Sequence, residues 1–185
     1  MTFKETGFKD LWLCEPNVFK DDRGYFFEAF NKEDFRKKTG LDVDFVQQNQ
    51  SCSTRGVLRG MHLQKGEYAQ AKLIRVIQGR VLDAVVDLRK DSETFGQSYT
   101  VELSGENNRQ LFVPRGFAHG FLVLSPEVLF VYSCDNFYAK GQELTLKYDD
   151  ALAAVQWPLS QSEYILSEKD KKGLDFDSVI EALNG

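Results

Sequence analysis

The chain contains only two histidines, and both lie where the sequence predicts the edge of a β-strand in a glycine-rich frame. His62 closes the apolar run GVLRGMH at residues 56–62, three positions after Arg59. His119 follows the turn sequence PRG at residues 114–116 and precedes a second apolar run. Histidine can take up and return a proton near neutral pH. The two positions therefore predict that the imidazoles serve acid–base chemistry.

The composition predicts a folded protein that binds neither nucleic acid nor a membrane. The 185 residues suffice for one domain with a sizeable core, and 42% of them are hydrophobic. The formal net charge of −5 disfavours non-specific binding to DNA or to an anionic membrane. No run approaches the roughly 18 apolar residues of a membrane-spanning helix. A small anionic ligand can still bind a local cluster of Arg and Lys.

The N-terminus and the cysteines predict a cytoplasmic protein. The first twelve residues carry four charged side chains and cannot form the apolar core of a signal peptide. The three cysteines are widely spaced and form neither a metal-ligand pattern nor a disulfide framework; they are Cys14, Cys52 and Cys134. We expect free thiols, buried or half-buried, in a reducing compartment.

Short apolar runs separated by turn signals predict an antiparallel β-sandwich or barrel. The run 72–88 is interrupted at Gln78 and Gly79, which predicts two strands joined as a hairpin, because glycine accepts the positive φ of a tight turn. Further strands are expected at 98–103, 110–113, 120–124 and 128–134.

Two helices are expected outside the strands. Asn31 can cap a helix that runs to Lys38, with acidic residues in its first turn, basic residues in its last turn and Gly40 after it. Near the C-terminus, four apolar residues share one face of a short helix; they are Phe176, Val179, Ile180 and Leu183. We expect this helix to cover the open end of the β core.

The pattern Pro-x-Gly-x-x-His at residues 114–119 resembles the second motif of the cupin small barrel. In many cupins that histidine joins a His-x-His pair and a Glu to hold a metal ion. Here Leu63 and Gln64 follow His62, so the second imidazole of the pair is missing. Two histidines cannot form a three-histidine site in one chain, whereas a site of two histidines and a carboxylate stays open. We expect no catalytic metal and no cofactor.

Seven segments in order resemble one family, that of dTDP-4-dehydrorhamnose 3,5-epimerase. They are DRGYFFE at 22–28, FVQQNQS at 45–51, GVLRGMH at 56–62, AQAK at 69–72, VVDLR at 85–89, TFG at 94–96 and GFAHGF at 116–121. The resemblance runs from about residue 5 to residue 175 and implies a single cupin-type jelly-roll domain over residues 1–185. The chain departs from the family pattern at Met61, Leu63 and residues 144–146, which bears on fine substrate preference.

The resemblance implies metal-free epimerisation of dTDP-4-dehydro-6-deoxy-α-D-glucose at C3 and C5. The product would be dTDP-4-dehydro-β-L-rhamnose, made for dTDP-L-rhamnose biosynthesis. Inverting a carbon beside a ketone requires a base and an acid on opposite faces of a flat enolate. A donor must also stabilise the ketone oxygen as charge develops, which is worth about 3–4 kcal/mol for a well-placed group.

The resemblance assigns three catalytic side chains directly to the substrate. It makes His62 the base that abstracts the proton and Tyr132 the acid on the other face, with Tyr138 as a rival for the acid. Lys72 stands at the start of a strand, where an inward-facing ammonium is costly unless it meets an anion. It therefore suits the enolate oxygen, although an edge lysine in solvent is the alternative.

The resemblance also assigns one orienting carboxylate and a set of binding residues. Asp170 matches the carboxylate that holds the His62 ring, with Asp83 as the competing candidate. Arg23 and Arg59 suit the diphosphate, because a guanidinium matches phosphate oxygens. The remaining residues expected to contact nucleotide or sugar are Glu28, Gln47, Gln48, Asn49, Lys72, His119, Tyr138, Glu143 and Lys169.

Three other functions stay open at the level of sequence. A relative could invert one carbon only, or move the ketone between C3 and C4. A non-catalytic cupin could bind a sugar nucleotide without turnover, and a metal-dependent cupin could use a different chemistry. The family resemblance further implies a homodimer in which an N-terminal strand is exchanged, so that Arg23 and Glu28 serve the partner's site.

Overall fold

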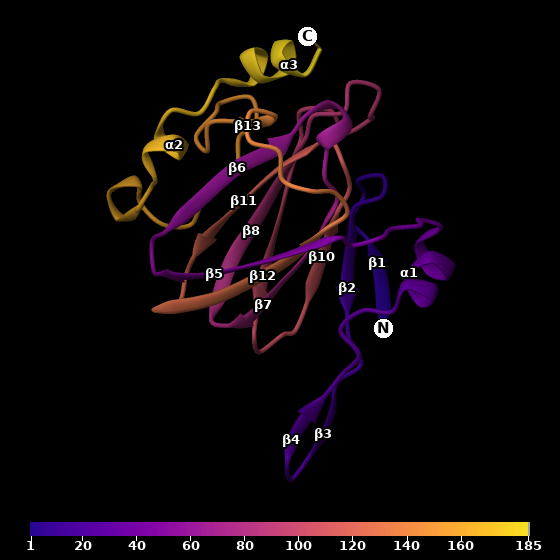
Figure 1. Ribbon diagram of the computed structural model, residues 1–185. Coiled ribbons are helices and arrows are strands. Elements are labelled where there is room, and N and C mark those ends of the chain that lie inside the picture. The colour runs from indigo at the N-terminus through magenta and orange to yellow at the C-terminus, as the bar shows by residue number, and fades with distance from the viewer. Residues whose placement is uncertain (185) are drawn as a thin grey trace.

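The computed structural model describes residues 1–184, so Gly185, the last residue of the predicted domain, lies outside the described residues. The larger of two packed sheets has six antiparallel strands in the order β1-β2-β10-β7-β12-β5 (Figure 1). Their bounds are β1 (Thr2–Glu5), β2 (Trp12–Glu15), β10 (Gln110–Val113), β7 (Lys72–Gln78), β12 (Glu127–Cys134) and β5 (Gln47–Thr54).

The smaller sheet has five antiparallel strands in the order β13-β6-β11-β8-β9. Their bounds are β13 (Glu143–Thr145), β6 (Leu58–Gln64), β11 (Phe117–Val123), β8 (Arg80–Asp87) and β9 (Ser98–Ser104). The predicted antiparallel sandwich of the cupin jelly-roll type is confirmed.

The main core lies between the two sheets, because side chains alternate across each strand and one face of every long strand is apolar. Strands of both sheets supply its buried members, among them Ile74, Val85, Leu111, Phe121 and Phe130. Phe121 of the smaller sheet stacks on Phe130 of the larger, with ring centroids 4.0 Å apart. The same interior holds polar side chains toward one side, and these form the site described below.

The predicted hairpin over residues 72–88 is wrong in its pairing. Both strands exist as β7 and β8, with Gly79 at φ 81° between them, but they belong to different sheets and do not pair. A side chain at Gly79 would clash with Glu127 and Ser125. The chain therefore crosses between the sheets at a point where a residue with a Cβ does not fit. A glycine turn predicts a change of direction and cannot say which strands become hydrogen-bonded.

The remaining predicted strands are confirmed, with ends that shift by up to three residues. Strand 110–113 matches β10, while β11 begins at Phe117 rather than at residue 120. The helix after Asn31 is confirmed as α1 (Lys32–Thr39): the Asn31 side chain accepts a hydrogen bond from the Asp34 N–H at 3.1 Å, and Gly40 ends the helix at φ 77°. These caps are local interactions, which is why the sequence predicts them well.

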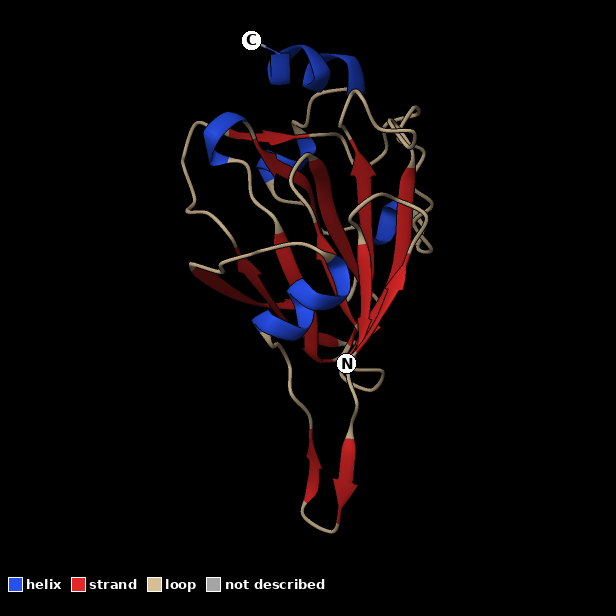
Figure 2. Ribbon diagram, turned by 90° about the vertical axis from the view of Figure 1, so that its right-hand side faces the viewer, coloured by secondary structure: helices blue, strands red, loops and turns tan. Residues whose placement is uncertain are grey.

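Helices cover the outer faces of the sheets. Helix α1 inserts Phe35 into an aromatic cluster on the larger sheet, on the side that faces the viewer in Figure 2. Helix α3 (Phe176–Asn184) is confirmed near the C-terminus and buries Phe176 and Val179. It packs with Met61 and Leu63 on the outer face of the smaller sheet, so it covers a face rather than the open end of the core. No helix among residues 1–184 is long and apolar enough to span a bilayer.

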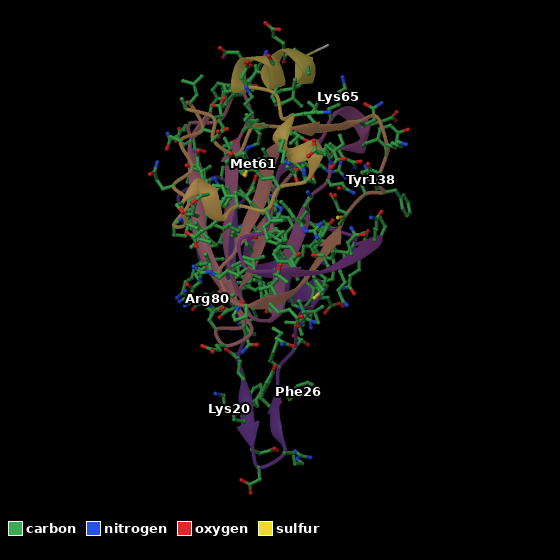
Figure 3. The ribbon with its side chains drawn as sticks, turned by 90° about the vertical axis from the view of Figure 1, so that its left-hand side faces the viewer. Lys20, Phe26, Met61, Lys65, Arg80 and Tyr138 are labelled. Carbon is green, nitrogen blue, oxygen red and sulfur yellow. The ribbon has the colours of Figure 1, made fainter. Side chains whose placement is uncertain are left out.

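A two-stranded hairpin of β3 (Phe19–Asp21) and β4 (Gly24–Phe26) projects away from the sandwich (Figures 1 and 3). Its aromatic residues are exposed, with Phe19 at 65% and Phe26 at 70%. Isolated two-stranded ribbons are marginally stable, and exposed aromatic clusters mark contact surfaces. The hairpin thus has the exposed aromatic surface that is typical of a contact region.

Two glycines allow β6 and β11 to approach closely beside the histidines. The pairing register between these strands shifts between His119 and Phe121, opposite Gly60. A Cβ on Gly60 would lie 2.5 Å from the Gly120 Cα and 2.9 Å from the His119 carbonyl oxygen. The close approach fixes the pairing of His119 with His62 across the two strands.

Replacing Gly60 with Ala should destabilise the fold, because Gly60 also has a φ of 131°. We expect the free energy of unfolding in urea to fall by about 3 kcal/mol or more. Gly66→Ala is the matched control, since Gly66 also has a positive φ of 61° but open space around it. That control should cost about 1 kcal/mol. Equal losses in the two variants would contradict the close approach.

Candidate active site

Strand β6 presents His62 to the interior of the sandwich. Its neighbours Met61 and Leu63 point to the opposite face and join the outer cluster under α3, as strand alternation requires. The His62 side chain keeps 25% exposure, so a ligand can reach it. On either side, β6 pairs His62 with His119 of β11 and with Thr145 of β13. A side chain held in the middle of a sheet has a fixed position.

Asp170 holds the His62 ring from the C-terminal segment. It lies in the short helix α2 (Glu168–Lys171), and its Oδ1 is 2.6 Å from the His62 Nε2. Ser167 caps α2 and donates its hydroxyl to Asp170 Oδ2 at 2.7 Å. Burial opposes ionisation of Asp170, but the hydrogen bonds from His62 and Ser167 outweigh it and lower the pKa of this carboxyl. An ionised Asp170 can only accept, so the Nε2 of His62 carries the donated proton.

The competing carboxylate, Asp83, is paired with the other histidine. His119 Nε2 lies 3.1 and 2.9 Å from the two Asp83 oxygens, and both side chains are buried. Burial raises the pKa of Asp83, while His119 acts in the opposite direction. Between the two predicted candidates, the structure therefore puts Asp170, not Asp83, against His62.

The larger sheet contributes Tyr132 and Lys72 to the same cavity. They come from the paired strands β12 and β7, and the Lys72 Nζ lies 5.8 Å from the centre of the Tyr132 ring. Burial raises the pKa of the Tyr132 phenol, which keeps it protonated at neutral pH. Burial also lowers the pKa of Lys72, although Cys134, Glu143 and Asp83 favour its charged form. His62 and Tyr132 thus stand on opposite sheets around one space.

That space is a cavity of about 650 Å³. Polar side chains and an apolar wall that includes Phe121 and Phe130 line it together. Its predicted members are Asn49, Arg59, His62, Lys72, His119, Tyr132, Lys169 and Asp170. Among these, Arg59 directs its guanidinium Nε and Nη2 to the Ser53 hydroxyl at 3.2 Å each. A neutral hydroxyl leaves the positive charge of Arg59 available to an anion.

A hydrogen-bonded group at the edge of the sandwich consists of Tyr138, Glu143 and Lys169. The Tyr138 hydroxyl donates to Glu143 Oε2 at 3.1 Å, and the Lys169 Nζ lies 2.6 Å from the same oxygen. Burial opposes ionisation of Glu143, yet Lys169 and the neighbouring His62 outweigh it and lower its pKa. Figure 3 shows Tyr138 at the edge of the sandwich, away from the hairpin that carries Phe26.

Six predicted binding residues do not line this cavity: Tyr138 and Glu143, described above, and four others. Arg23 lies on the β3–β4 hairpin with its side chain 90% exposed and pairs with Asp21, and the exposed Glu28 accepts from Asn31. Gln48 points to the outer face of β5 and donates to Ser133. Gln47 uses its amide within the chain, donating to Asn49 at 3.0 Å and accepting from the Tyr138 N–H at 3.0 Å.

Nine residues that line the cavity were not predicted from the sequence, among them Ser167, Phe121 and Phe130. Ser167 had a local signal, because a serine three positions before a carboxylate is typical of a helix cap. Phe121 and Phe130 read as ordinary strand residues, and no local signal marks them as a cavity wall. Within residues 1–184, no three His, Cys, Asp or Glu side chains are grouped so that they could hold a metal ion.

Known proteins match this chain over nearly its full length. A family model described as dTDP-4-dehydrorhamnose 3,5-epimerase matches residues 5–178. The chain belongs to this family. It is therefore an isomerase of the epimerase type. The dTDP-4-dehydrorhamnose 3,5-epimerase of Shigella flexneri is 48% identical over 176 residues, which cover 95% of this chain and 96% of that protein.

Solved structures agree with this assignment. The dTDP-4-dehydrorhamnose 3,5-epimerase of Elizabethkingia anophelis is 51% identical with a TM-score of 0.93, covering 96% of this chain and 97% of that one. The dTDP-6-deoxy-D-glucose-3,5-epimerase of Legionella pneumophila, in complex with dTDP-4-keto-L-rhamnose, is 40% identical with a TM-score of 0.94. The two chains are covered to 98% and 96%.

One structural neighbour has a different reaction in its description. ChmJ of Streptomyces bikiniensis, described as a 3'-monoepimerase and solved with dTDP-quinovose, is 33% identical with a TM-score of 0.87. The alignment covers 95% of this chain and 87% of that one. The fold alone therefore does not decide how many carbons are inverted.

Replacing Asp170 with Asn should reduce stability in a way that depends on pH. The lowered pKa of Asp170 means that its ionised form stabilises the fold above the ordinary carboxyl range. This contribution is lost as the pH falls through the lowered value, below about 4. Urea unfolding of both proteins should give a difference in unfolding free energy that is largest near neutrality and shrinks toward pH 3. A difference that is constant with pH would contradict the assignment.

Proposed function

We propose that the chain epimerises dTDP-4-dehydro-6-deoxy-α-D-glucose at C3 and C5 to dTDP-4-dehydro-β-L-rhamnose, without a metal or cofactor, in dTDP-L-rhamnose biosynthesis. One observation carries the proposal: a histidine with a carboxylate partner and a protonated tyrosine line one cavity from opposite sheets. Inversion beside a ketone needs this arrangement, because the proton leaves one face and returns to the other. The names of the relatives supply the substrate class.

His62 acts as the base in this proposal. Its Nε2 proton is donated to Asp170, so the lone pair on Nδ1 is free to take the proton from the carbon. The electron pair of the broken C–H bond moves into the C4 carbonyl and forms an enolate. The carboxylate of Asp170 stabilises the positive charge that results on His62, and Asp170 itself stays ionised.

Lys72 and Tyr132 complete the proton transfer. Lys72 suits the enolate oxygen, since an ammonium in a low-dielectric cavity stabilises a developing negative charge strongly. Tyr132 then donates its phenolic proton to the opposite face of the same carbon, and its raised pKa keeps that proton available. Proton exchange with solvent then returns His62 to its neutral form and Tyr132 to its phenol. A second cycle at the other carbon uses the same groups, with C4 common to both enolates.

The remaining predicted residues bind and orient the substrate. Arg59 suits the diphosphate through its guanidinium, and Asn49 and His119 line the cavity where the sugar would lie. Tyr138 offers an aromatic face for the nucleotide, linked to Glu143 and Lys169 at the margin of the site. The apolar wall of Phe121 and Phe130 suits a sugar that lacks a hydroxyl at C6.

We further propose a cytoplasmic homodimer in which the β3–β4 hairpin of one subunit completes the site of the other. The hairpin carries Arg23 away from its own cavity, and its aromatic side chains are exposed in the single chain. An interface would bury that apolar surface and bring a second guanidinium to the diphosphate. The thiols of Cys14 and Cys134 are free and buried, as expected, whereas Cys52 is exposed, contrary to the expectation. Free thiols are in keeping with a reducing compartment.

Epimerisation of a single carbon is the second candidate, and the similarity to the 3'-monoepimerase ChmJ favours it. The two candidates share the base, the acid and the lysine. They differ in whether the sugar can present both C3 and C5 to His62, which depends on how it turns inside the cavity. Counting the exchanged carbons separates them.

Turnover in D₂O tests the reaction directly. We expect the wild-type protein to introduce deuterium at both C3 and C5 of the sugar, as followed by proton NMR. His62→Ala should lower exchange at both carbons by at least about 10³-fold. Tyr132→Phe should still exchange while the configuration is retained, because His62 can return deuterium to the face it came from.

Each alternative gives a distinct result in the same experiment. Deuterium at one carbon would replace the double epimerase with a single one, and a 3-keto product would indicate movement of the ketone. Tight binding of the substrate with no exchange at any ring carbon would indicate a binding protein. Equal loss of exchange in His62→Ala and Tyr132→Phe would contradict the division between base and acid. Activity lost on exhaustive chelation would overturn the metal-free mechanism.

Mixing two inactive variants tests the shared site. Arg23→Ala and His62→Ala should each be nearly inactive alone, because one lacks the donated arginine and the other lacks the base. After unfolding and refolding together, random pairing gives about half mixed dimers, each with one intact site. We therefore expect about a quarter of the wild-type activity to return. Unchanged inactivity of a mixture shown to contain mixed dimers would place Arg23 in its own subunit's site.

A further inference from the structure

Gln64 is a buried residue whose side-chain amide bonds to the loop after β12 and to the backbone of Tyr68. The residue is 6% exposed. Its Nε2 donates to the Tyr68 carbonyl at 2.9 Å and to the Phe137 carbonyl at 3.1 Å. Its Oε1 accepts from the Ala139 N–H at 2.7 Å. A buried amide with three satisfied bonds is a rigid clamp, since loosening any of them leaves a polar group unpaired.

The clamped segment, residues 135–142, is the connection between the two sheets at the margin of the cavity. It leaves β12 in the larger sheet and enters β13 in the smaller one. Two glutamines hold its backbone, one from each sheet: Gln64 of β6 binds the peptide groups on both sides of Tyr138, and Gln47 of β5 accepts from the Tyr138 N–H at 3.0 Å. Three successive residues of the loop are thereby tied to the sandwich.

Tyr138 depends on this backbone support, because its side chain has little packing of its own. The residue is 54% exposed, and its hydroxyl bonds to Glu143, the first residue of β13. An exposed ring on an unsupported loop would sample many positions. Fixing the peptide groups on both sides of a residue fixes the direction of its Cα–Cβ bond.

We propose that Gln64 is a positioning residue for nucleotide binding, which holds the Phe137–Ala139 backbone so that the Tyr138 ring meets the nucleotide of the substrate. The inference rests on the proposed function, because it takes the ligand to be a dTDP-sugar. A loop ordered before binding does not lose conformational entropy on binding, so the clamp acts on affinity. It also gives a reason for the amide at residue 64, where a metal-binding cupin would carry its second imidazole.

Kinetics of a matched pair of variants test the role. Gln64→Met keeps the length of the side chain and removes all three bonds, and Gln97→Met makes the same change at an exposed glutamine outside the cavity. We expect Gln64→Met to raise the KM for the dTDP-sugar and the Kd of dTDP about tenfold, with kcat changed less than about twofold. Gln97→Met should match the wild type. A fall in kcat at unchanged KM would overturn the proposal.

A double-mutant cycle with Tyr138→Ala tests whether Gln64 acts through the ring. If it does, the Kd of dTDP for the double variant should equal that for Tyr138→Ala within about twofold. Independent losses that multiply would show that Gln64 supports binding by another route and would overturn the inference. Calorimetry with dTDP gives this readout even if the chain catalyses no epimerisation, so failure of the proposed function can be recognised separately.

Hydrogen exchange followed by mass spectrometry tests the clamp without any ligand. The amide protection of the peptide that contains residues 137–139 should fall in Gln64→Met and stay unchanged in Gln97→Met, while the strands keep their protection. Unaltered protection of the loop would overturn the positioning role. If Gln64→Met does not fold, Gln64→Glu keeps the acceptor for Ala139 and loses both donors, and the same direction of change in protection and in Kd is expected.

Discussion

An ionisable group inside an apolar sandwich must be paired, hydrogen-bonded or neutral, and the site of this protein is organised by that constraint. Asp83 is matched by His119, and Asp170 by His62. Lys72 differs, because no carboxylate of residues 1–184 lies within 4.0 Å of its ammonium. Like Arg59, it is a cavity cation that no carboxylate pairs within that distance in residues 1–184. An anion formed during a reaction would supply the negative charge that the Lys72 ammonium lacks in the free protein.

The two-sheet architecture places these buried groups on two opposite walls of the cavity. The smaller sheet supplies the imidazole and the larger sheet supplies the phenol and the ammonium. Stacking of Phe121 on Phe130 joins the sheets behind them at an ordinary van der Waals separation. Because a sandwich interior is close-packed, neither wall can move toward the other. A ligand in this cavity therefore meets different chemistry on its two faces.

The sequence predicted features that depend on neighbours along the chain and missed those that depend on distant ones. The caps of α1 at Asn31 and Gly40 follow from contacts a few residues long, and they were predicted. The crossing at Gly79 was predicted as a hairpin. The residues around the turn do not determine that β7 pairs with β10 and β12, which are distant in the sequence. Strand alternation could not reveal that Gln48 faces outward until the register with β12 was known.

The site divides along the same line. His62 stood out through its rarity and its frame, whereas its pairing with Asp170 came from family resemblance alone, since 108 residues separate the two. Gln64 was noted as the place of a missing imidazole, and its three bonds to Tyr68, Phe137 and Ala139 appear only in three dimensions. Roles of buried amides depend on what surrounds them, and sequence patterns carry little of that information.

The separation of His62 from Asp170 in the sequence also has a consequence for the folding of the chain. Strand β5 pairs with β12, and β2 lies between β1 and β10. The carboxylate partner of His62 belongs to the last fifth of the chain. Topologies rich in such distant pairings fold slowly, because large loops must close before any contact rewards them. A nascent or truncated chain therefore holds His62 long before it holds the carboxylate that pairs with this ring.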